Sequence, residues 1–399
     1  MPLFGARRPL IDENGGLAGF EFRLPPVVAE RLAQQSDNVA IAAHATALLT
    51  SMRDTIDAGR TALIALPITL LARPAVLEAV PRGVWLAITD ADQPAMQTTR
   101  ALETLTELNR LGAKLGGVGQ PMSGCDFVVL DATNIAATRL VEDVTAIRAL
   151  WGEVKVVATG IGSIGDLELL LNNGIDLAAG VVDTTTTVLE RTPMSPRLQQ
   201  ICRLIHHVVS DEDLVETTSV LRSEVELSYQ ILRQANSATN GQTRPVDSVD
   251  HAAMLMGRDG LYQWLTMLLL TGGSGRATSR ALREIALSRA RLLEMLAGYD
   301  ATGTASPSAM FTLGLLSLLD VMLQTDMRDA LDKLPLTPAL RAALVEKSGE
   351  LRPALELVQA LERGDLAGAA DLAWPFGGLD VVIAESDEAW TWAAEAVRR

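Results

Sequence analysis

Histidine and cysteine, the residues most often used for metal binding and nucleophilic chemistry, are scarce in this chain. The histidines are His44, His206, His207 and His251, and the cysteines are Cys125 and Cys202. His206 and His207 are adjacent in a helical pattern, so at most one of them faces inward, and no His-Asp pair is present in the sequence. The chain also has no Gly-x-Ser-x-Gly motif for a nucleophilic serine. We therefore predict neither a histidine-based metal site nor nucleophilic hydrolysis.

Residues 160–165 read Gly-Ile-Gly-Ser-Ile-Gly, a literal Gly-x-Gly-x-x-Gly motif between the apolar run VKVVAT and the helical pattern SIGDLELLL. In dinucleotide-binding proteins this motif places a pyrophosphate at a helix N-terminus, and an acidic residue about 20 positions later contacts a ribose. Asp183 stands near such a position. The motif normally belongs to the first strand–helix unit of a domain, whereas here it comes last, which favours a simple turn into a helix. A dinucleotide-binding enzyme remains an alternative function.

These residues lie in a first half in which strand-like and helix-like patterns alternate. A turn sequence at residues 13–16 separates two apolar strands, and a long helical pattern runs from about Val27 to Ala58. Six further apolar runs of strand length follow, at residues 62–67, 83–89, 113–119, 126–132, 154–160 and 175–182. Apolar runs that alternate with amphipathic helices indicate a parallel sheet buried on both faces. A TIM-like barrel and a doubly wound sheet both fit this pattern.

Strand patterns largely end near residue 190, and the second half reads as a series of amphipathic helices. Leu227 and Ile231 recur at helical spacing in one such segment, and Ile285, Leu292 and Leu296 recur in another. At 399 residues the chain is too long for one ordinary domain. We therefore predict an α/β domain at residues 1–190 and an all-helical domain at residues 191–399.

Composition excludes several classes of function. The net charge of −15 argues against nucleic acid and against an anionic membrane surface, because both need clustered Lys and Arg. The longest apolar run, TLGLLSLLDVML, is interrupted by Asp320 and is shorter than the roughly 20 residues that span a bilayer. The N-terminal residues have no signal-peptide pattern, and the two cysteines suit a reducing compartment. We expect a cytoplasmic protein.

The helical half contains a more specific pattern. LSYQILRQANSATNG at residues 227–241 is followed by VDSVDHAAMLMGRDGLYQWL at residues 246–265, with an expected helix break at Met256 and Gly257. This order resembles the HDOD domain, a helical module of bacterial signalling proteins that lacks the histidine–aspartate metal ligands of its enzymatic relatives. Asn236 and Ser237 recur in the HDOD pattern, and their place at a helix end favours a structural capping role. Later segments, such as residues 286–298 and 310–323, resemble the subgroup that joins HDOD to a preceding EAL domain.

The first half is similar to a shortened EAL domain, the TIM-barrel-like phosphodiesterase domain of cyclic di-GMP signalling. The segment RRPLIDENGGLAGFEFRL has the shape of the family's first hairpin, in which the motif glutamate is a metal ligand. Glu21 occupies that place in this chain. Phe22 and Arg23 stand where the family has Ala and Leu, and Pro25 stands where an arginine usually contacts the ligand phosphate.

The other site positions of the family are matched mostly by residues that cannot bind metal. The asparagine ligand falls among Ala65, Leu66 and Pro67, the next acidic position falls at Ala87 or Asp90, and the paired aspartates fall in Leu115-Gly116-Gly117-Val118. The lysine falls at Val129, which leaves Asp131, and the later glutamates are replaced by Thr159 and Gly162. EAL chemistry requires two divalent metals held by several carboxylates. We therefore expect no catalytic, metal or cofactor site, with Glu21 and Asp131 as vestigial positions.

The resemblance leads to one main functional hypothesis and two alternatives. The main hypothesis is a non-enzymatic signalling scaffold that acts through protein–protein contacts with other signalling proteins, linked to cyclic di-GMP. A sensor that binds cyclic di-GMP without hydrolysing it is the first alternative, although loss of the phosphate-contacting arginine predicts weak binding or none. The dinucleotide-binding enzyme is the second alternative. Neither nucleic acid nor membrane is expected as a partner.

Overall fold

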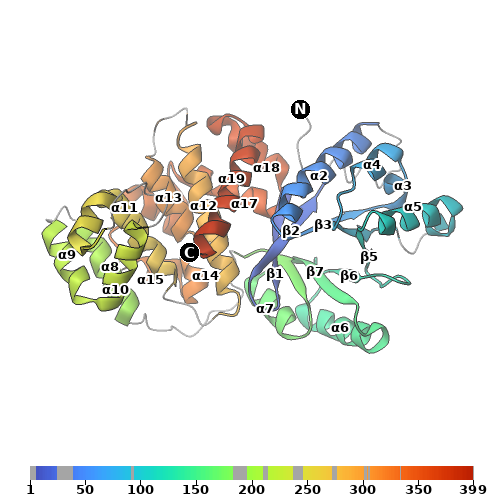
Figure 1. The fold of residues 1–399 in the computed structure, drawn as a ribbon, viewed down its shortest axis with the longest axis horizontal. Coiled ribbons are helices and arrows are strands. Elements are labelled where there is room, and N and C mark those ends of the chain that lie inside the picture. The colour runs from blue at the N-terminus through green and yellow to red at the C-terminus, as the bar shows by residue number, and fades with distance from the viewer. Residues whose placement is uncertain are drawn as a thin grey trace. The chain divides into compact units, whose positions relative to one another are not determined.

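The fold was determined as a computed structural model of the 399-residue chain. It describes residues 6–24, 39–90, 94–182, 196–209, 214–236, 246–271, 276–300, 303, 306–332 and 334–398. Eight strands in the first half form a closed barrel in chain order (Figure 1). They are β1 (Ala6–Asp12), β2 (Leu17–Arg23), β3 (Thr61–Leu66), β4 (Trp85–Ile88), β5 (Lys114–Val118), β6 (Phe127–Asp131), β7 (Lys155–Ile161) and β8 (Leu177–Gly180). Because the sheet is closed, the TIM-like barrel is the correct one of the two predicted arrangements, and the doubly wound sheet is excluded.

Strand direction in the barrel departs from the all-parallel pattern at one strand. β1 is antiparallel to β2 and to β8, where Leu10 pairs with Ala179, and the other neighbouring strands are parallel. The barrel interior is filled by apolar side chains, including Leu10, Leu63, Phe127 and Val157. The rings of Trp85 and Phe127 pack with their centroids 4.8 Å apart. The interior is therefore a packed core, and ligands can enter only above it, at the strand ends.

The turn between β1 and β2 follows its predicted chemistry. The Asp12 carboxylate accepts hydrogen bonds from the N–H groups of Asn14 and Gly16, both at 2.9 Å. Gly15 has a φ of +70°, a value that glycine adopts without strain. A Cβ atom at Gly15 would also lie 1.7 Å from the carbonyl oxygen of Ala277. Glycine is thus required at this position for two independent reasons.

Helices connect the barrel strands. They are α2 (Val39–Asp57), α3 (Ile68–Leu71), α4 (Pro74–Ala79), η1 (Pro94–Gln97), α5 (Thr99–Arg110), α6 (Ala137–Trp151) and α7 (Ile164–Asn172). The helix predicted from about Val27 is present from Val39 onwards, and residues 25–38 lie outside the described part of the chain. Thr98 and Ser163 cap the starts of α5 and α7 by accepting backbone N–H hydrogen bonds.

The second half contains only helices and their connections among the described residues beyond residue 195. They are α8 (Pro196–Val209), α9 (Leu214–Ser223), α10 (Val225–Ala235), α11 (Val249–Thr271), α12 (Ser279–Leu296), α13 (Pro307–Leu316), α14 (Leu319–Leu323), α15 (Met327–Leu331), α16 (Pro338–Arg341), the π-helical η3 (Ala342–Glu346), α17 (Arg352–Arg363), α18 (Leu366–Ala373), η4 (Trp374–Phe376) and α19 (Leu379–Arg398). The break expected near Met256 is present, because Gly257 interrupts α11 with φ +65° and ψ 178°. The all-helical second half is thereby confirmed.

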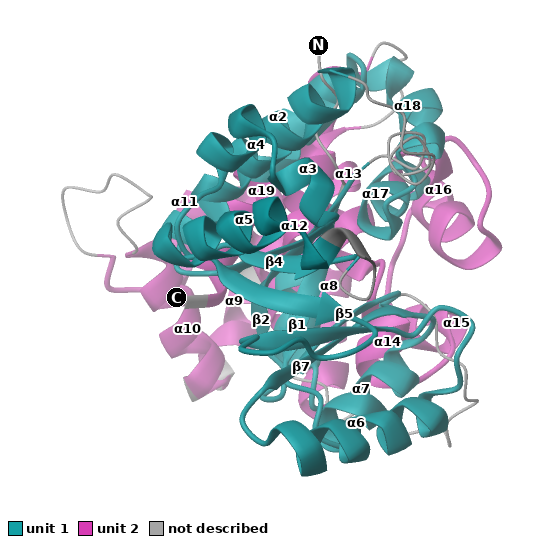
Figure 2. Ribbon diagram, turned by 90° about the vertical axis from the view of Figure 1, so that its right-hand side faces the viewer, with its two compact units in different colours: residues 1–187, 277–285, 356–387 teal, residues 188–276, 286–355, 388–399 magenta. Residues whose placement is uncertain are grey.

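The chain divides into two compact units that do not coincide with two continuous segments (Figure 2). Unit 1 contains residues 1–187 together with residues 277–285 and 356–387, and unit 2 contains residues 188–276, 286–355 and 388–399. The predicted boundary near residue 190 falls in residues 183–195, which lie outside the described part. The barrel therefore shares its unit with two segments from the second half.

Specific contacts join the barrel to the first of these segments. The Ala281 N–H donates to the carbonyl oxygen of Gly15 at 3.0 Å, and the Thr278 hydroxyl donates to Glu168 of α7 at 2.6 Å. Arg60, which precedes β3, forms an ion pair with Glu284 of α12, and both side chains are nearly buried. The start of α12 is therefore a structural part of the barrel unit.

None of the described helices alone is both long enough and apolar enough to cross a membrane. One sharply bent pair, 366–376 with 379–397, meets this requirement together, by length and composition only.

Candidate functional site

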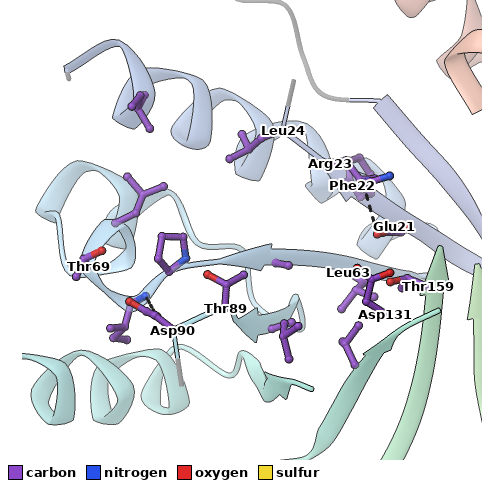
Figure 3. A pocket seen from close by; sticks show the side chains of 18 of the residues that line it. Glu21, Phe22, Arg23, Leu24, Leu63, Thr69, Thr89, Asp90, Asp131 and Thr159 are labelled. Atoms are coloured by element: carbon purple, nitrogen blue, oxygen red, sulfur yellow. Dashed lines mark hydrogen bonds and ion pairs between the residues drawn. The ribbon is translucent and has the colours of Figure 1, made fainter. Parts of the chain in front are cut away.

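A cleft with a volume of about 1140 Å³ lies at the carboxyl ends of the barrel strands. Its walls come from β1 to β7, from α2, α3 and α5, and from the residues between α3 and α4. Figure 3 shows Glu21, Asp131 and Thr159 close together at one end, with Thr69, Thr89 and Asp90 at the other end. This is the position at which barrels of this kind place their functional groups, because the loops after the strands converge there.

Glu21 is paired with an arginine across the first hairpin. Arg8 on β1 lies directly opposite Glu21 on β2 in the antiparallel register, so both side chains project from the same face. The Arg8 Nη1 to Glu21 Oε2 distance is 3.4 Å, and Arg23 Nε lies 3.8 Å from Glu21 Oε1. The Glu21 side chain is only 13% exposed and that of Arg8 only 9%. The carboxylate is therefore engaged by two guanidinium groups.

The surroundings shift the protonation equilibria of this pair. Burial raises the pKa of the Glu21 carboxyl above its ordinary value, while Arg8 and Arg23 oppose the rise and Asp131 adds to it. Burial also lowers the pKa of the Arg8 guanidinium, and the charge of Glu21 opposes that change. Both shifts show that the two groups are poorly solvated. They offset each other's charge without a bound metal ion.

Asp131, the second vestigial position, lies at the end of β6 on the exposed rim of the cleft. Its Oδ1 accepts the N–H of Thr133 at 2.9 Å, which forms a local turn. A Cβ atom at Gly160 would lie 2.7 Å from this Oδ1 and 2.4 Å from the Thr133 hydroxyl oxygen. Gly160 is therefore needed to make room for the Asp131 turn, which explains the first glycine of the Gly-x-Gly-x-x-Gly motif without a ligand.

The rest of that motif shows no close approach that would demand glycine. A Cβ atom at Gly162 would meet nothing within 4 Å, and one at Gly165 would meet only the Ser163 hydroxyl at 3.9 Å. Ser163 instead caps α7 by accepting the Asp166 N–H. Asp183 lies outside the described residues. The motif thus forms a turn into a capped helix, as the simpler interpretation predicts.

Asp90 supports the fold at the other end of the cleft. It is 6% exposed, and its Oδ1 accepts the N–H of Ile68 at 2.7 Å, at the start of α3. The carboxylate thereby satisfies a backbone donor that the short helix leaves open. Asp90 therefore has a structural role, at a distance from Glu21 and Asp131 along the cleft (Figure 3).

The remaining positions of the expected metal site present side chains that bind metal poorly. Ala65, Ala87, Val118, Val129 and Thr159 line the cleft at the ends of β3 to β7. Among the described residues, no group of three or more His, Cys, Asp or Glu side chains could hold a metal ion. The described residues that line the cleft include four arginines instead, Arg8, Arg23, Arg73 and Arg100.

Sequence reasoning did not identify Arg8 as a site residue. The signal for it lies in the hairpin itself, because counting outward from the turn at residues 13–16 places Arg8 opposite Glu21. Arg73 and Arg100 follow barrel strands only through the intervening loops and helices, so periodicity gave no indication that they line the cleft. Arg100 donates to the carbonyl oxygen of Ala72 at 2.9 Å, which holds it near the α3–α4 segment.

In the helical unit, Asn236 closes the end of α10. Its amide nitrogen donates to the carbonyl oxygens of Leu232 and Val246, both at 2.8 Å, and its Oδ1 accepts the Val246 N–H at 2.7 Å. One side chain therefore ties the last turn of α10 to the segment that leads into α11. This geometry is the one that a capping role requires. Ser237 lies outside the described residues.

The comparison with protein families identifies the second half. Residues 194–336 match the model of the HDOD domain. This match places an HDOD domain after the closed barrel, in the order that the sequence predicted.

Two curated relatives and one solved structure are similar to the chain. The uncharacterized protein YuxH of Bacillus subtilis (strain 168) is 24% identical over 205 residues, which are 51% of this chain and 50% of that protein. The cyclic di-GMP phosphodiesterase CdgJ of Vibrio cholerae is 22% identical over 340 residues, which are 84% of this chain and 76% of that protein. The crystal structure of an EAL domain protein from Listeria monocytogenes EGD-e has a TM-score of 0.35 and 16% identity, and covers 44% of this chain and 85% of that chain. The chain thus spans about half the length of the first of these relatives.

Proposed function

We propose that this chain, which joins an EAL-like barrel to an HDOD domain, is a non-hydrolysing regulatory protein of cyclic di-GMP signalling. It acts through contacts with other signalling proteins in the cytoplasm. The link to cyclic di-GMP rests on the architecture and on the similarity to CdgJ. The absence of hydrolysis rests on the residues of the cleft.

The observation that carries this proposal is the ion pair between Arg8 and Glu21. Hydrolysis by two divalent metals needs several carboxylates that can bind the metals and activate water. Glu21 is neutralised by Arg8 at 3.4 Å, and Asp90 is used to accept the Ile68 N–H. Among the described residues that line the cleft, Asp131 is then the acidic side chain at the Glu21 end that such a metal could reach. A single carboxylate of this kind does not assemble a two-metal centre.

A scaffold function is supported by what the second half contains. The HDOD match covers a helical region, and its motif residue Asn236 is engaged with backbone groups. The net charge of −15 disfavours phosphate-rich partners. Other signalling proteins are therefore the class of partner that we expect, and affinity capture of the tagged full chain from its own cells is the experiment that identifies them.

Whether the cleft binds a divalent metal ion is tested by titrating Mn²⁺ into the full chain and following free Mn²⁺ by electron paramagnetic resonance. We expect no stoichiometric site in the micromolar range. Arg8→Gln is the informative variant, because it frees Glu21, and we expect it to remain without a tight site since the other ligands are absent. A stoichiometric Mn²⁺ site in the wild type that Glu21→Gln removes would contradict the proposal.

A second candidate function, binding of cyclic di-GMP without hydrolysis, is favoured by the size and cationic lining of the cleft. A volume of about 1140 Å³ admits a nucleotide, and Arg73 and Arg100 lie at the end opposite Glu21. Calorimetry with cyclic di-GMP and the full chain separates the two candidates. The scaffold predicts weak or no binding, whereas the sensor predicts a micromolar or tighter Kd that Arg100→Ala weakens. Arg110→Ala, in the same helix but paired with Glu107 outside the cleft, is the matched control.

A further inference from the structure

Arg8 contacts a second acceptor in addition to Glu21. Its Nη2 donates to the main-chain carbonyl oxygen of Arg363 at 3.0 Å, across 355 positions of sequence. The same side chain also lines the cleft. One guanidinium group therefore joins three features, namely the cleft, the Glu21 carboxylate and the end of α17. All of these residues belong to unit 1.

The carbonyl that Arg8 reaches lies at a joint between two helices. α17 ends at Arg363, Gly364 follows with a φ of +81°, and Asp365 caps α18 by accepting the Gly368 N–H at 2.9 Å. The N–H groups of Gly364 and Asp365 donate back to Leu361 and Ala360 of α17. A helix C-terminus leaves carbonyl groups without intrahelical partners and carries partial negative charge, so a buried cation stabilises it. Arg8 is that cation for α17.

The Arg8 guanidinium has few alternative partners. The residue is 7% exposed, and its Nε atom is buried without a hydrogen-bond partner among the described residues. Burial weakens the screening of charges, so the guanidinium responds strongly to any change of charge beside it. A change at Glu21 therefore alters the force that holds Arg8 against the Arg363 carbonyl.

We infer that Arg8 couples the cleft to the α17–α18 joint, so that an anionic group of a phosphate-bearing ligand in the cleft loosens the end of α17. Such a group competes with the Arg363 carbonyl for the same N–H donors. The chain passes from unit 2 to unit 1 within α17. Residues 352–355 of this helix belong to unit 2, and residues 356–363 belong to unit 1. A change in the cleft that loosens the joint therefore acts on a helix whose backbone continues into unit 2. Coupling of this kind needs only that the ligand binds one state of Arg8 more tightly than the other.

This inference rests on the second candidate function, in which the cleft binds an anionic ligand, but its test uses neither hydrolysis nor an added ligand. The readout is hydrogen exchange of the Gly364 and Asp365 amides in the full chain. Arg8→Gln should accelerate their exchange roughly tenfold, because a charged hydrogen bond to the joint is lost. Glu21→Gln should instead slow the exchange of the same amides, because it removes an anionic competitor for the Arg8 N–H donors and leaves them to the Arg363 carbonyl.

The decisive comparison is the double variant. If Arg8 is the link, Glu21→Gln adds nothing to the exchange rates once Arg8→Gln is present. Arg23→Gln is the matched control, because Arg23 also lies beside Glu21 and lines the cleft, and it should leave the two amides within about twofold of wild type. If Arg8→Gln fails to fold, Arg8→Lys replaces it, since one ammonium group cannot hold both acceptors in the same geometry. Additive effects of the two substitutions, or no effect of Glu21→Gln, would overturn the inference.

Discussion

Glu21 shows how a single neighbouring residue changes what a motif position can do. The sequence resemblance predicts that this carboxylate takes the place of an EAL metal ligand, yet the cross-strand partner Arg8 engages it at 3.4 Å. The pair is buried at the wall of the cleft, so its charges interact with little solvent screening. The type of residue at position 21 was evident from the sequence, whereas its partner depends on the register of β1 against β2.

The raised pKa of Glu21 predicts a defined pH dependence of stability. Because the folded-state pKa lies above the ordinary value of 4.5, the folded protein holds this proton more tightly than the unfolded chain. Stability that Glu21 contributes is therefore complete below the ordinary pKa and is lost as the pH rises through the raised pKa. Relative to Glu21→Gln, the wild type should lose stability over that range, as measured by denaturant unfolding at a series of pH values. Arg8, Arg23 and Asp131 are the charged neighbours of Glu21, and Asp131→Asn should make this loss of stability smaller, because Asp131 adds to the rise of the Glu21 pKa.

At the scale of elements, the glycine in α11 separates two helical segments. Gly257 has φ +65° and ψ 178°, a conformation that is essentially restricted to glycine. A Cβ atom there would meet nothing within 4 Å, so crowding plays no part in the choice of residue. The break therefore depends on backbone conformation alone.

Two substitutions in α11 test this explanation. Gly257→Ala should destabilise the protein by about 1–3 kcal/mol, because alanine is strained at this φ and ψ. Gly260→Ala lies within the same helix, and its Cβ would meet only the Met256 Cβ at an ordinary 3.4 Å, so it should be neutral or stabilise by up to about 1 kcal/mol. Denaturant unfolding measures both changes. Equal effects of the two substitutions would count against a special backbone role for Gly257.

The elements were largely predictable, and their closure into a barrel was not. The apolar runs at residues 62–67 through 175–182 became β3 to β8 because each buries side chains on both faces of the sheet. The same runs would suit an open sheet, since periodicity contains no information about whether the first and last strands meet. Closure depends on pairs such as Leu10 with Ala179, which are far apart in sequence.

At the scale of the whole molecule, the barrel unit includes one segment from within the HDOD match, residues 277–285, and one that follows it, residues 356–387. Residues 277–285 contact the β1–β2 turn and α7, and residues 356–387 include the carbonyl that Arg8 reaches. No local pattern predicts such contacts, because a site like Gly15 beside Ala277 becomes evident only in three dimensions. A barrel stabilised in this way should depend on residues of the second half.

Glu284 provides the test of this dependence. It forms a nearly buried ion pair with Arg60, and Arg60 also lies over the ring of Phe20, 5.9 Å from its centroid. Glu284→Gln leaves Arg60 buried without its counter-charge and should destabilise the barrel by about 3–5 kcal/mol. Glu294→Gln, in the same helix, breaks a more exposed pair with Arg291 and should cost at most about 1 kcal/mol. Hydrogen exchange of the β3 amides reports on the barrel, and unchanged exchange in Glu284→Gln would show that the barrel does not need α12.

The central claim, that the barrel no longer hydrolyses cyclic di-GMP, is tested most directly by turnover. The full chain is incubated with cyclic di-GMP and Mg²⁺ or Mn²⁺, and the products are separated by chromatography, with Glu21→Ala measured in parallel. Because Glu21 is neutralised by Arg8 and most of the other expected metal-ligand positions hold Ala, Val and Thr, we predict that the wild type and Glu21→Ala give the same background. Metal-dependent turnover by the wild type that Glu21→Ala abolishes would contradict the account.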